Sequence, residues 1–349
     1  MVCIAAFIVL AVLSLSLPIV RIFNKKKADS IWKNLKAAWG CVGRRVTFRP
    51  CDTSFKQDIE RAILKKVLRK NPKLIKPAKV GIEIVAALII IVTIWSLLTV
   101  VKSGLALYVY GTCDIRTPSA CSLSNTEACT IETTSTSGAV VDWFTDWGEV
   151  FSALPARMTT WNASDYIPSG GSAYTARESN DLPVAIDIFD PGCIVCNQSY
   201  HAQKATGFMD RYRVYVIPYA IPSENGYRFA NSHLVSQYIE AIRGQHESVN
   251  EWTIIERLFT GRDEVEKRDY QSAFNTVYSA DKAEEVLLSW LNDAGLSLEQ
   301  QEAIKNRAHS TDIADKLAAN KHLVEDTIKT KRIPTMLYDG RRHEGLFTK

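Results

Sequence analysis

The sequence predicts an α/β domain preceded by two membrane-spanning helices. Two runs without a charged residue, at residues 2–20 and 84–101, have the length of a membrane span. A strand, a turn with a CxxC motif, a helix and a second strand follow one another over residues 183–222. A further apolar strand, which opens at a proline and continues into a hairpin turn, lies within residues 333–347. The predicted fold class rests on these observations.

The two apolar runs predict transmembrane helices at residues 1–23 and 81–103. Residues 21–79 contain 18 Lys and Arg against 4 Asp and Glu, a net charge of +14, so the rest of the chain carries −10. Because short loops rich in Lys and Arg stay in the cytoplasm, we expect the loop 24–80 inside and everything after about residue 103 outside. A cleaved signal peptide would have its positive charges before the apolar run, whereas here they follow it. The sequence therefore predicts a two-pass protein of the cell membrane with a large outer domain.

The basic loop contains the stretch FKQDIERAILKKVLRK, residues 55–70, whose apolar residues recur every four positions. A basic amphipathic helix of this kind suits the anionic inner face of a membrane, so the lipid bilayer is an expected partner. Nucleic acid is the alternative partner for a segment with this positive charge. No DNA- or RNA-binding motif accompanies the segment, so we do not expect a nucleic-acid partner. Cys41 and Cys51 lie in the same loop, where thiols stay reduced and two sulfurs alone do not make a metal site.

Three cysteines, Cys113, Cys121 and Cys129, follow the second apolar run. Oxidising conditions outside the cytoplasm allow disulfides, so we expect two of the three to form a structural bond, and the sequence leaves the pairing open. A zinc site would need a fourth ligand and this stretch contains no His, so no metal site is predicted. Ser/Thr/Gly-rich pieces flank the aromatic stretch VDWFTDWGEVFSALP, so residues 104–171 are expected to form a Cys-containing segment and a tether with one short helix.

The centre of the outer domain is predicted around the CxxC motif. PVAIDIF, residues 183–189, is rich in branched residues and predicts a buried strand that ends at the turn signal Asp190-Pro191-Gly192. The following stretch contains no further proline, so we expect a helix to begin near Cys193, and RVYVIPYAIP predicts a second strand. Near the end of the chain, Ile333-Pro334-Thr335 opens another apolar run, and Asp339-Gly340 predicts a hairpin turn before RRHEGLF.

With these residues, the region 172–349 resembles a DsbA-type thioredoxin-fold thiol:disulfide oxidoreductase. Cys193 and Cys196 match the active-site pair of that family, and Asp187 lies six residues before Cys193, where the family keeps a buried carboxylate. The segment Ile333-Pro334-Thr335 matches its cis-proline segment. The resemblance implies a thioredoxin fold with an inserted helical domain. A thioredoxin fold normally closes with a helix after its last hairpin, and this sequence contains none there.

Residues from about 223 to 330 fit the inserted helical domain that the resemblance implies. HLVSQYIEAIRG has apolar residues on one helical face. SADKAEEVLLSWLNDAG is expected to form a helix with Asp281 as its N-cap and Gly295 as its stop, and SLEQQEAIKNRA opens with a capping box of Ser297 and Gln300.

The positions of the two cysteines predict their chemistry. A cysteine at a helix N-terminus has its thiolate stabilised by free N–H groups and the helix dipole, so we expect Cys193 to be the nucleophile and Cys196 the resolving thiol. Asp187, if buried beneath the pair, would carry the proton of Cys196. Pro334, with Ile333 and Thr335, would shape a groove in which a partner's cysteine-containing segment pairs like an added strand.

The expected partners are unfolded or secreted proteins with cysteines, and a membrane redox partner that acts as a quinone-linked reoxidant or an electron donor. No bound cofactor is expected. The direction of exchange stays open, because oxidases, reductases and isomerases share the fold and differ in reduction potential. Ile194-Val195 offers no polar group to stabilise a thiolate, which favours a less extreme oxidant than the strongest family members. One cysteine of the three in residues 104–171 could relay electrons to Cys193.

The alternative function is a binding module that senses redox state or carries a metal on the same thiol pair. His201 stands five residues after Cys196, which suggests a ligand, but no fourth ligand is obvious and a surface His is the favoured interpretation. Pro334 suits the enzyme and would obstruct a ligand that approaches the sulfurs.

Overall fold

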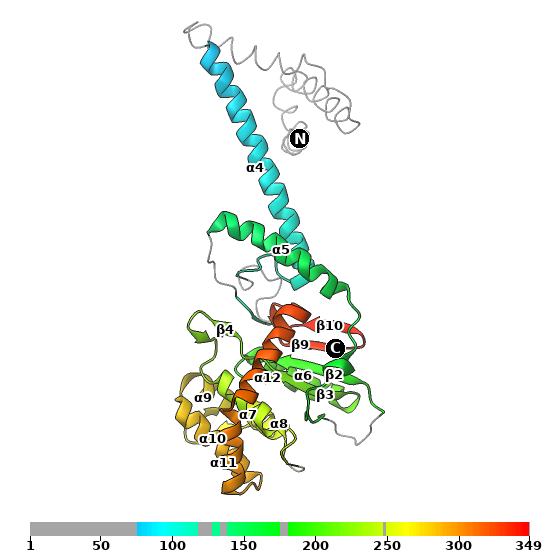
Figure 1. Cartoon of the computed structure of the whole chain (residues 1–349), viewed down its shortest axis with the longest axis vertical. Coiled ribbons are helices and arrows are strands. Elements are labelled where there is room, and N and C mark those ends of the chain that lie inside the picture. Colours follow the sequence, from blue (N-terminus) through cyan, green and yellow to red (C-terminus); the bar gives the residue numbers. More distant parts are fainter. Residues whose placement is uncertain (1–74, 118–127, 133–137, 175–180, 247–248, 349) are drawn as a thin grey trace, which may run out of the picture. The chain divides into compact units, whose positions relative to one another are not determined.

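The computed structural model describes residues 75–117, 128–132, 138–174, 181–246 and 249–348 (Figure 1). The expected membrane helix 1–23 and all of the basic loop up to residue 74 lie outside the described residues, as do Cys41, Cys51 and Cys121. The chain divides into two compact units, Met1–Val101 and Lys102–Lys349. The candidate site belongs to the second unit.

One long helix, α4 (Ile75–Tyr110), includes the second predicted span at 81–103. Several of its apolar side chains are exposed, among them Ile91 and Val92. No helix among the described residues has both the length and the hydropathy that crossing a membrane requires. The membrane location of residues 81–103 stays a prediction.

The second unit is built on a four-stranded mixed sheet with the order β10-β9-β2-β3. Its strands are β2 (Val184–Phe189), β3 (Arg213–Pro218), β9 (Thr335–Tyr338) and β10 (Arg341–Glu344). The central strand β2 is parallel to β3 and antiparallel to β9, and all six of its residues are buried because strands flank it on both sides. These directions and this order are those of a thioredoxin-like sheet, as expected.

The predicted hairpin at the end of the chain is confirmed. Strands β9 and β10 pair antiparallel, with Tyr338 opposite Arg341 across the two-residue turn Asp339-Gly340. Both turn residues have a positive φ, 49° at Asp339 and 73° at Gly340. A two-residue turn of this kind favours Asp and Gly because its twist matches that of the strands it joins.

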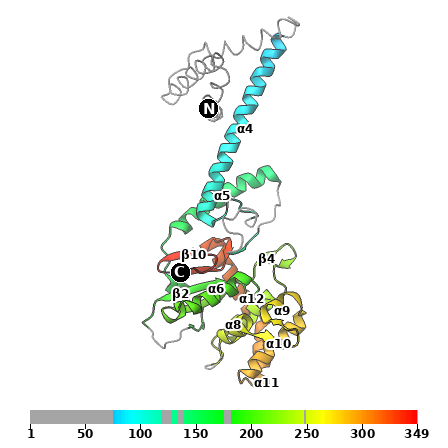
Figure 2. The same ribbon diagram turned by 180° about the vertical axis from the view of Figure 1, so that it is seen from behind.

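Six α-helices among the described residues between β3 and β9 form most of the predicted insertion, and Figures 1 and 2 show them gathered beside the sheet. They are α7 (Ser232–Ile242), α8 (Glu251–Thr260), α9 (Tyr270–Thr276), α10 (Ala280–Asp293), α11 (Leu298–Ala308) and α12 (Thr311–His322). A single cluster of buried apolar side chains runs through sheet and insertion. The insertion therefore shares the core of the sheet.

The helix caps of the insertion confirm one sequence expectation and correct another. The capping box of Ser297 and Gln300 is present at the start of α11. Asp281 is not the N-cap of α10: Ser279 occupies that position, and its hydroxyl accepts a hydrogen bond from the amide of Lys282. Ser is as good a cap as Asp, and here it stands two residues earlier, which lengthens the helix.

The segment expected to be a tether packs on the same unit. It contains the helix α5 (Ala139–Met158), which is longer than the short helix expected. Asp146 of α5 forms ion pairs with Lys102 at 2.7 Å and Arg116 at 2.8 Å. The guanidinium of Arg342 in β10 donates to the carbonyl of Val109 at 2.7 Å. The described residues 102–117 and 138–158 thus have fixed contacts within the second unit.

Candidate functional site: a three-cysteine centre

The loop between β2 and α6 (Ile194–Ala205) presents Cys193 at the helix N-terminus, as predicted. Cys193 is the N-cap residue, and its amide donates to the carbonyl of Asp190 at 3.0 Å. Gly192 precedes it at a point of close approach: a Cβ atom there would lie 2.3 Å from the Cβ of Phe229. Only glycine lets the insertion come this close to the CxxC loop.

Cys193 forms its disulfide with Cys129, and Cys196 is a buried free thiol. The bonded residues lie 64 positions apart in the sequence, with a Cα–Cα distance of 6.2 Å. The expected structural bond among Cys113, Cys121 and Cys129 therefore does not include Cys129, which bonds to the CxxC motif instead. Cys113 is disulfide-bonded too. A pairing over such a separation has no local signal in the sequence.

A short strand brings Cys129 to the proline segment. Strand β1 (Cys129–Thr130) pairs antiparallel with β8 (Arg332–Ile333), with Cys129 opposite Ile333. The predicted cis peptide bond is present between Ile333 and Pro334. The sulfur of Cys193 lies 3.9 Å from the carbonyl oxygen of Ile333. The disulfide therefore lies directly against the cis-proline segment, with a backbone ladder beside it.

Asp187 is buried in the middle of β2, as predicted. One of its carboxylate oxygens accepts a hydrogen bond from Gln203 of α6 at 2.7 Å, and the other has no hydrogen-bond partner among the described residues. Burial raises the pKa of Asp187 to about 6, and the hydrogen bond from Gln203 opposes that shift. The carboxyl group thus titrates near neutral pH.

The thiol of Cys196 is strongly held in its protonated form. Burial raises the pKa of Cys196 well above its usual range, and the negative charges of Asp187 and Asp190 add to the shift. The amide of Asp190, which donates to the sulfur at 3.4 Å, acts in the opposite direction. Ionisation of this thiol needs a base close by.

Asp190 is a second buried carboxyl at the site, and the sequence indicates it only as part of a turn signal. It accepts hydrogen bonds from the amide of Gly192 at 2.7 Å, the amide of Ile221 at 2.7 Å and the hydroxyl of Ser232 at 2.6 Å. Burial raises its pKa to about 6, against the effect of these bonds. The Asp-Pro-Gly sequence was a usable signal, because Asp at a turn commonly accepts from the amide two residues later.

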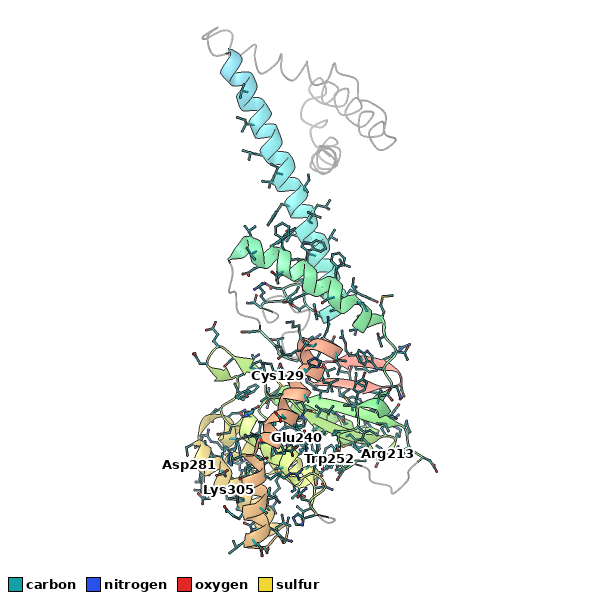
Figure 3. The ribbon with its side chains drawn as sticks, viewed as in Figure 1. Cys129, Arg213, Glu240, Trp252, Asp281 and Lys305 are labelled. Carbon is teal, nitrogen blue, oxygen red and sulfur yellow. A yellow bond between two sulfur atoms is a disulfide. The ribbon has the colours of Figure 1, made fainter. Side chains whose placement is uncertain are left out.

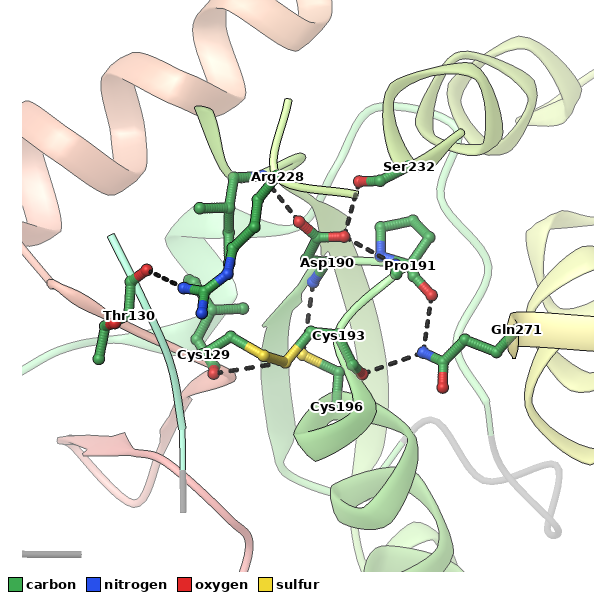
Figure 4. Close-up of a disulfide and its surroundings, with 12 residues drawn as sticks. Cys129, Thr130, Asp190, Pro191, Cys193, Cys196, Arg228, Ser232 and Gln271 are labelled. Atoms are coloured by element: carbon green, nitrogen blue, oxygen red, sulfur yellow. Dashed lines mark hydrogen bonds between the residues drawn. A yellow bond between two sulfur atoms is a disulfide. The ribbon is translucent and has the colours of Figure 1, made fainter. Parts of the chain in front are cut away.

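The insertion holds the CxxC loop through two amide side chains of α9. Gln271 donates to the carbonyls of Pro191 at 2.8 Å and Cys193 at 3.0 Å (Figure 4). Asn275 donates to the carbonyl of Gly192 at 2.8 Å. Neither residue was singled out by the sequence, because no motif connects α9 to a loop about 80 residues earlier.

The remaining predicted residues lie at the edge of the site. Thr335 is fully buried, and its hydroxyl donates to the carbonyl of Arg332 at 2.5 Å, so it supports the proline loop from within. His201 has a ring nitrogen 3.0 Å from the carbonyl of Phe259. The described part of the chain contains no cluster of three His, Cys, Asp or Glu side chains that could hold a metal ion.

No protein-family model and no curated protein matches the chain. Several solved structures are similar. ScsC of Proteus mirabilis in a compact conformation is 13% identical, covering 60% of this chain and 84% of that chain, with a TM-score of 0.37. MdbA, a thiol-disulfide oxidoreductase from Corynebacterium matruchotii, is 14% identical, covering 57% and 94%, with a TM-score of 0.37. The thiol-disulfide exchange protein α-DsbA2 of Wolbachia pipientis is 13% identical, covering 61% and 94%, with a TM-score of 0.35. Similarity of this degree leaves the activity to be argued from the site itself.

Proposed function

We propose that this chain is a membrane-anchored thiol:disulfide oxidoreductase that exchanges disulfides with cysteine-containing proteins outside the cytoplasm. The observation that carries the proposal is the arrangement at Cys193. Its sulfur stands at a helix N-terminus, is bonded to a cysteine that lies along the cis-proline segment, and has the thiol of Cys196 on the next turn of the helix. This is the geometry of a mixed disulfide in mid-exchange.

The exchange in the donating direction requires the disulfide between Cys193 and Cys196. A substrate thiolate attacks the sulfur of Cys193, the Cys193–Cys196 bond breaks, and Cys196 leaves as the thiolate. Asp187 supplies the proton that Cys196 takes up, because its pKa of about 6 lets it carry a proton near neutral pH. A second substrate thiolate then attacks the substrate sulfur of the mixed disulfide and displaces Cys193, whose thiolate the helix N-terminus stabilises.

Two electrons pass to the enzyme in each such cycle, so its disulfide must be restored. We propose that a quinone-linked membrane protein reoxidises the two thiols if the enzyme acts as an oxidase. If the enzyme acts as a reductase, a membrane electron donor would instead reduce its disulfide. The predicted spans at 1–23 and 81–103, with the basic loop between them, would anchor the domain in the lipid bilayer beside that partner. No bound cofactor is required.

Substrate side chains would lie beside the start of α6. A hollow of about 450 Å³ is present there, and its lining combines exposed apolar surface with amide groups. Ile194, which follows Cys193, borders it and is 59% exposed. Such a surface suits unfolded chains of varied sequence, because its apolar part discriminates little between side chains.

The test is the reduction potential of the Cys193–Cys196 pair, measured in the full chain with Cys129→Ser and equilibrated against glutathione buffers. A value near −120 mV would identify a disulfide donor, and a value near −270 mV a reductant of the thioredoxin type. Either value supports thiol-disulfide exchange and fixes its direction. A pair that does not equilibrate with glutathione at all would contradict the proposed activity.

A further inference from the structure

We propose that Cys129 is a third redox-active cysteine, and that the segment around it is an internal substrate which occupies the groove of this site. The inference rests on the proposed exchange activity and extends it. Cys129 would alternate between two states. In one state it is bonded to Cys193 and its segment fills the groove; in the other it is a free thiol and the groove is open.

The backbone contacts of this segment are those that a bound substrate strand would make. Cys129 and Thr130 pair antiparallel with Ile333 and Arg332, and the amide of Ile131 continues the ladder to the carbonyl of Lys331 at 2.9 Å. Added strands of this kind obtain their affinity from main-chain hydrogen bonds, which do not depend on sequence. An external segment and the internal one therefore compete for the same backbone groups.

A side chain from the insertion fastens the segment in place. Arg228, which follows the short strand β5 (Gly226–Tyr227), donates to the carbonyl of Thr130 at 2.8 Å (Figure 4). The side chains of Cys129, Thr130 and Ile131 are all buried. The strand is thus seated in the groove by three kinds of contact: the ladder, the Arg228 hydrogen bond and the disulfide.

The disulfide in this state is out of reach of external thiols. Cys193 is 0% exposed and Cys129 is 7% exposed. Thiol-disulfide exchange needs a thiolate in line with the sulfur under attack, so access limits the reaction. Figure 4 shows the sulfur of Cys196 directed toward the Cys129–Cys193 bond. Cys196 is therefore the thiol in position to open it.

The opening step is an isomerisation within the chain. Asp187 accepts the proton of Cys196, the Cys196 thiolate attacks the sulfur of Cys193, and the Cys193–Cys196 bond forms as the Cys129–Cys193 bond breaks. Cys129 leaves as the thiolate and is protonated. One disulfide is lost and one gained, so no electrons enter or leave and no further reagent is required. The product is the donor form of the proposed enzyme, with an unattached strand in its groove.

This isomerisation determines when the site can react with a substrate. A tethered segment acts at an effective concentration of about millimolar or above, so a dilute substrate does not displace it while the covalent bond persists. The observed reactivity is reduced by the fraction of chains in the open isomer. The internal strand therefore lowers the rate of exchange at any given substrate concentration.

The experiment maps the disulfides of the full chain and measures its rate of reaction. Chains that carry one disulfide among the three cysteines are quenched in acid, alkylated in denaturant and analysed by peptide mass spectrometry. We expect two species: Cys129–Cys193 with Cys196 alkylated, and Cys193–Cys196 with Cys129 alkylated. Their ratio should not change with the glutathione potential, because their interconversion is redox-neutral. Cys196→Ser should leave Cys129–Cys193 as the sole bond at Cys193.

The rate is measured with a fluorescent peptide that carries two reduced cysteines. The variant Cys129→Ser should oxidise the peptide faster than the natural chain, because every variant chain has an open groove. If one natural chain in ten is in the open isomer, the rate should rise about tenfold. Cys41→Ser is the matched control: it makes the same substitution in the predicted basic loop, keeps Cys129, Cys193 and Cys196, and should leave both the map and the rate unchanged.

The outcomes separate the two proposals. If Cys129→Ser reacts with the peptide but no Cys129–Cys193 bond is found in the natural chain or in Cys196→Ser, the internal substrate is wrong and the exchange activity stands. If the Cys129–Cys193 bond forms but never converts to Cys193–Cys196, Cys129 is a structural cross-link and the inference is again wrong. If Cys129→Ser forms its Cys193–Cys196 disulfide and does not oxidise the peptide, the proposed function itself is contradicted.

Discussion

Two buried carboxyl groups adjoin the free thiol, and their hydrogen bonds give them different tasks. Asp190 accepts from three donors, which fix its position in the CxxC loop. Asp187 accepts from Gln203 alone, and its second oxygen has no partner among the described residues. An oxygen without a donor is available to hold a proton. We therefore assign proton transfer with Cys196 to Asp187 and the shape of the CxxC loop to Asp190.

The substitution Asp187→Asn should raise stability and slow exchange. The pKa of Asp187 is about 6 in the folded chain against 3.8 as the ordinary value, so ionisation opposes folding. The loss of unfolding free energy caused by this ionisation is absent below about pH 4, grows as the pH rises to about 6 and stays constant above that pH. The variant should therefore gain up to about 3 kcal/mol in unfolding free energy between pH 4 and pH 7.5 relative to the natural chain.

Urea unfolding at these two pH values, in the same disulfide state, checks the gain in stability. Exchange with a dithiol peptide should fall about a hundredfold at pH 7, because Asn can neither supply a proton to the leaving Cys196 thiolate nor take one from the Cys196 thiol in the opening step. A variant that is stabilised with an unchanged rate would show that another group carries this proton.

Helix α7 and strand β3 are joined by one buried arginine, which explains how the insertion is held at a fixed position on the sheet. Arg243 follows α7, and its guanidinium forms ion pairs with Glu240 and Glu251 and donates to the carbonyl of Val216. The side chains of Arg243, Glu240 and Glu251 are all buried. Glu240 lies where the helices of the insertion meet the sheet (Figure 3). Since α9 holds the CxxC loop, the position of the insertion affects the geometry at Cys193.

Arg243→Ala should destabilise the chain by about 3 to 5 kcal/mol, because it leaves two buried carboxylates without a counter-charge. Arg257→Ala is the control. It removes an ion pair with Asp293 whose side chains are 40% and 53% exposed, and it should cost less than about 1 kcal/mol. Chemical unfolding of both variants measures the difference. Equal losses would show that the buried network contributes no more than a surface pair.

The elements differ in how far the sequence could predict them, for physical reasons. The strand at Val184–Phe189 was predictable because a central strand buries every residue and so needs a continuous apolar run. The cis-proline position and the two cysteines of the motif followed from fixed spacings in a known family. Strand β1 was not predictable. It has two residues, and its partner lies about 200 positions away, so neither composition nor periodicity indicates it.

At the scale of the whole molecule, the charge distribution predicts which side of a membrane each part occupies. The segment 21–79 carries +14 and the rest −10. The disulfide exchange proposed for Cys193 suits an oxidising compartment, and the predicted orientation would place the second unit there. The charge pattern and the chemistry at the site, which are independent properties of the chain, favour the same orientation.

Protease treatment of intact cells should cut the second unit and spare the basic loop. The hairpin β6–β7 (Arg262–Asp263 and Arg268–Asp269) has an exposed tip, with Val265 86% exposed, and trypsin should cut at Lys267 or Arg268. Immunoblots with antibodies against residues 24–80 and against the C-terminal region would follow each part. Inverted vesicles should give the opposite protection. Cleavage of the basic loop in intact cells would reverse the proposed orientation.

The disulfide at Cys193 also changes the size of the ring that it closes. With Cys129 the bond joins residues 64 positions apart, whereas with Cys196 it joins residues three apart. The larger ring removes more conformations from the unfolded chain, a difference of about 2.5 kcal/mol in loop-closure entropy. The isomer with the filled groove would therefore also melt at the higher temperature, so each act of opening the site loosens the domain. Thermal unfolding could then follow the state of this enzyme without any substrate.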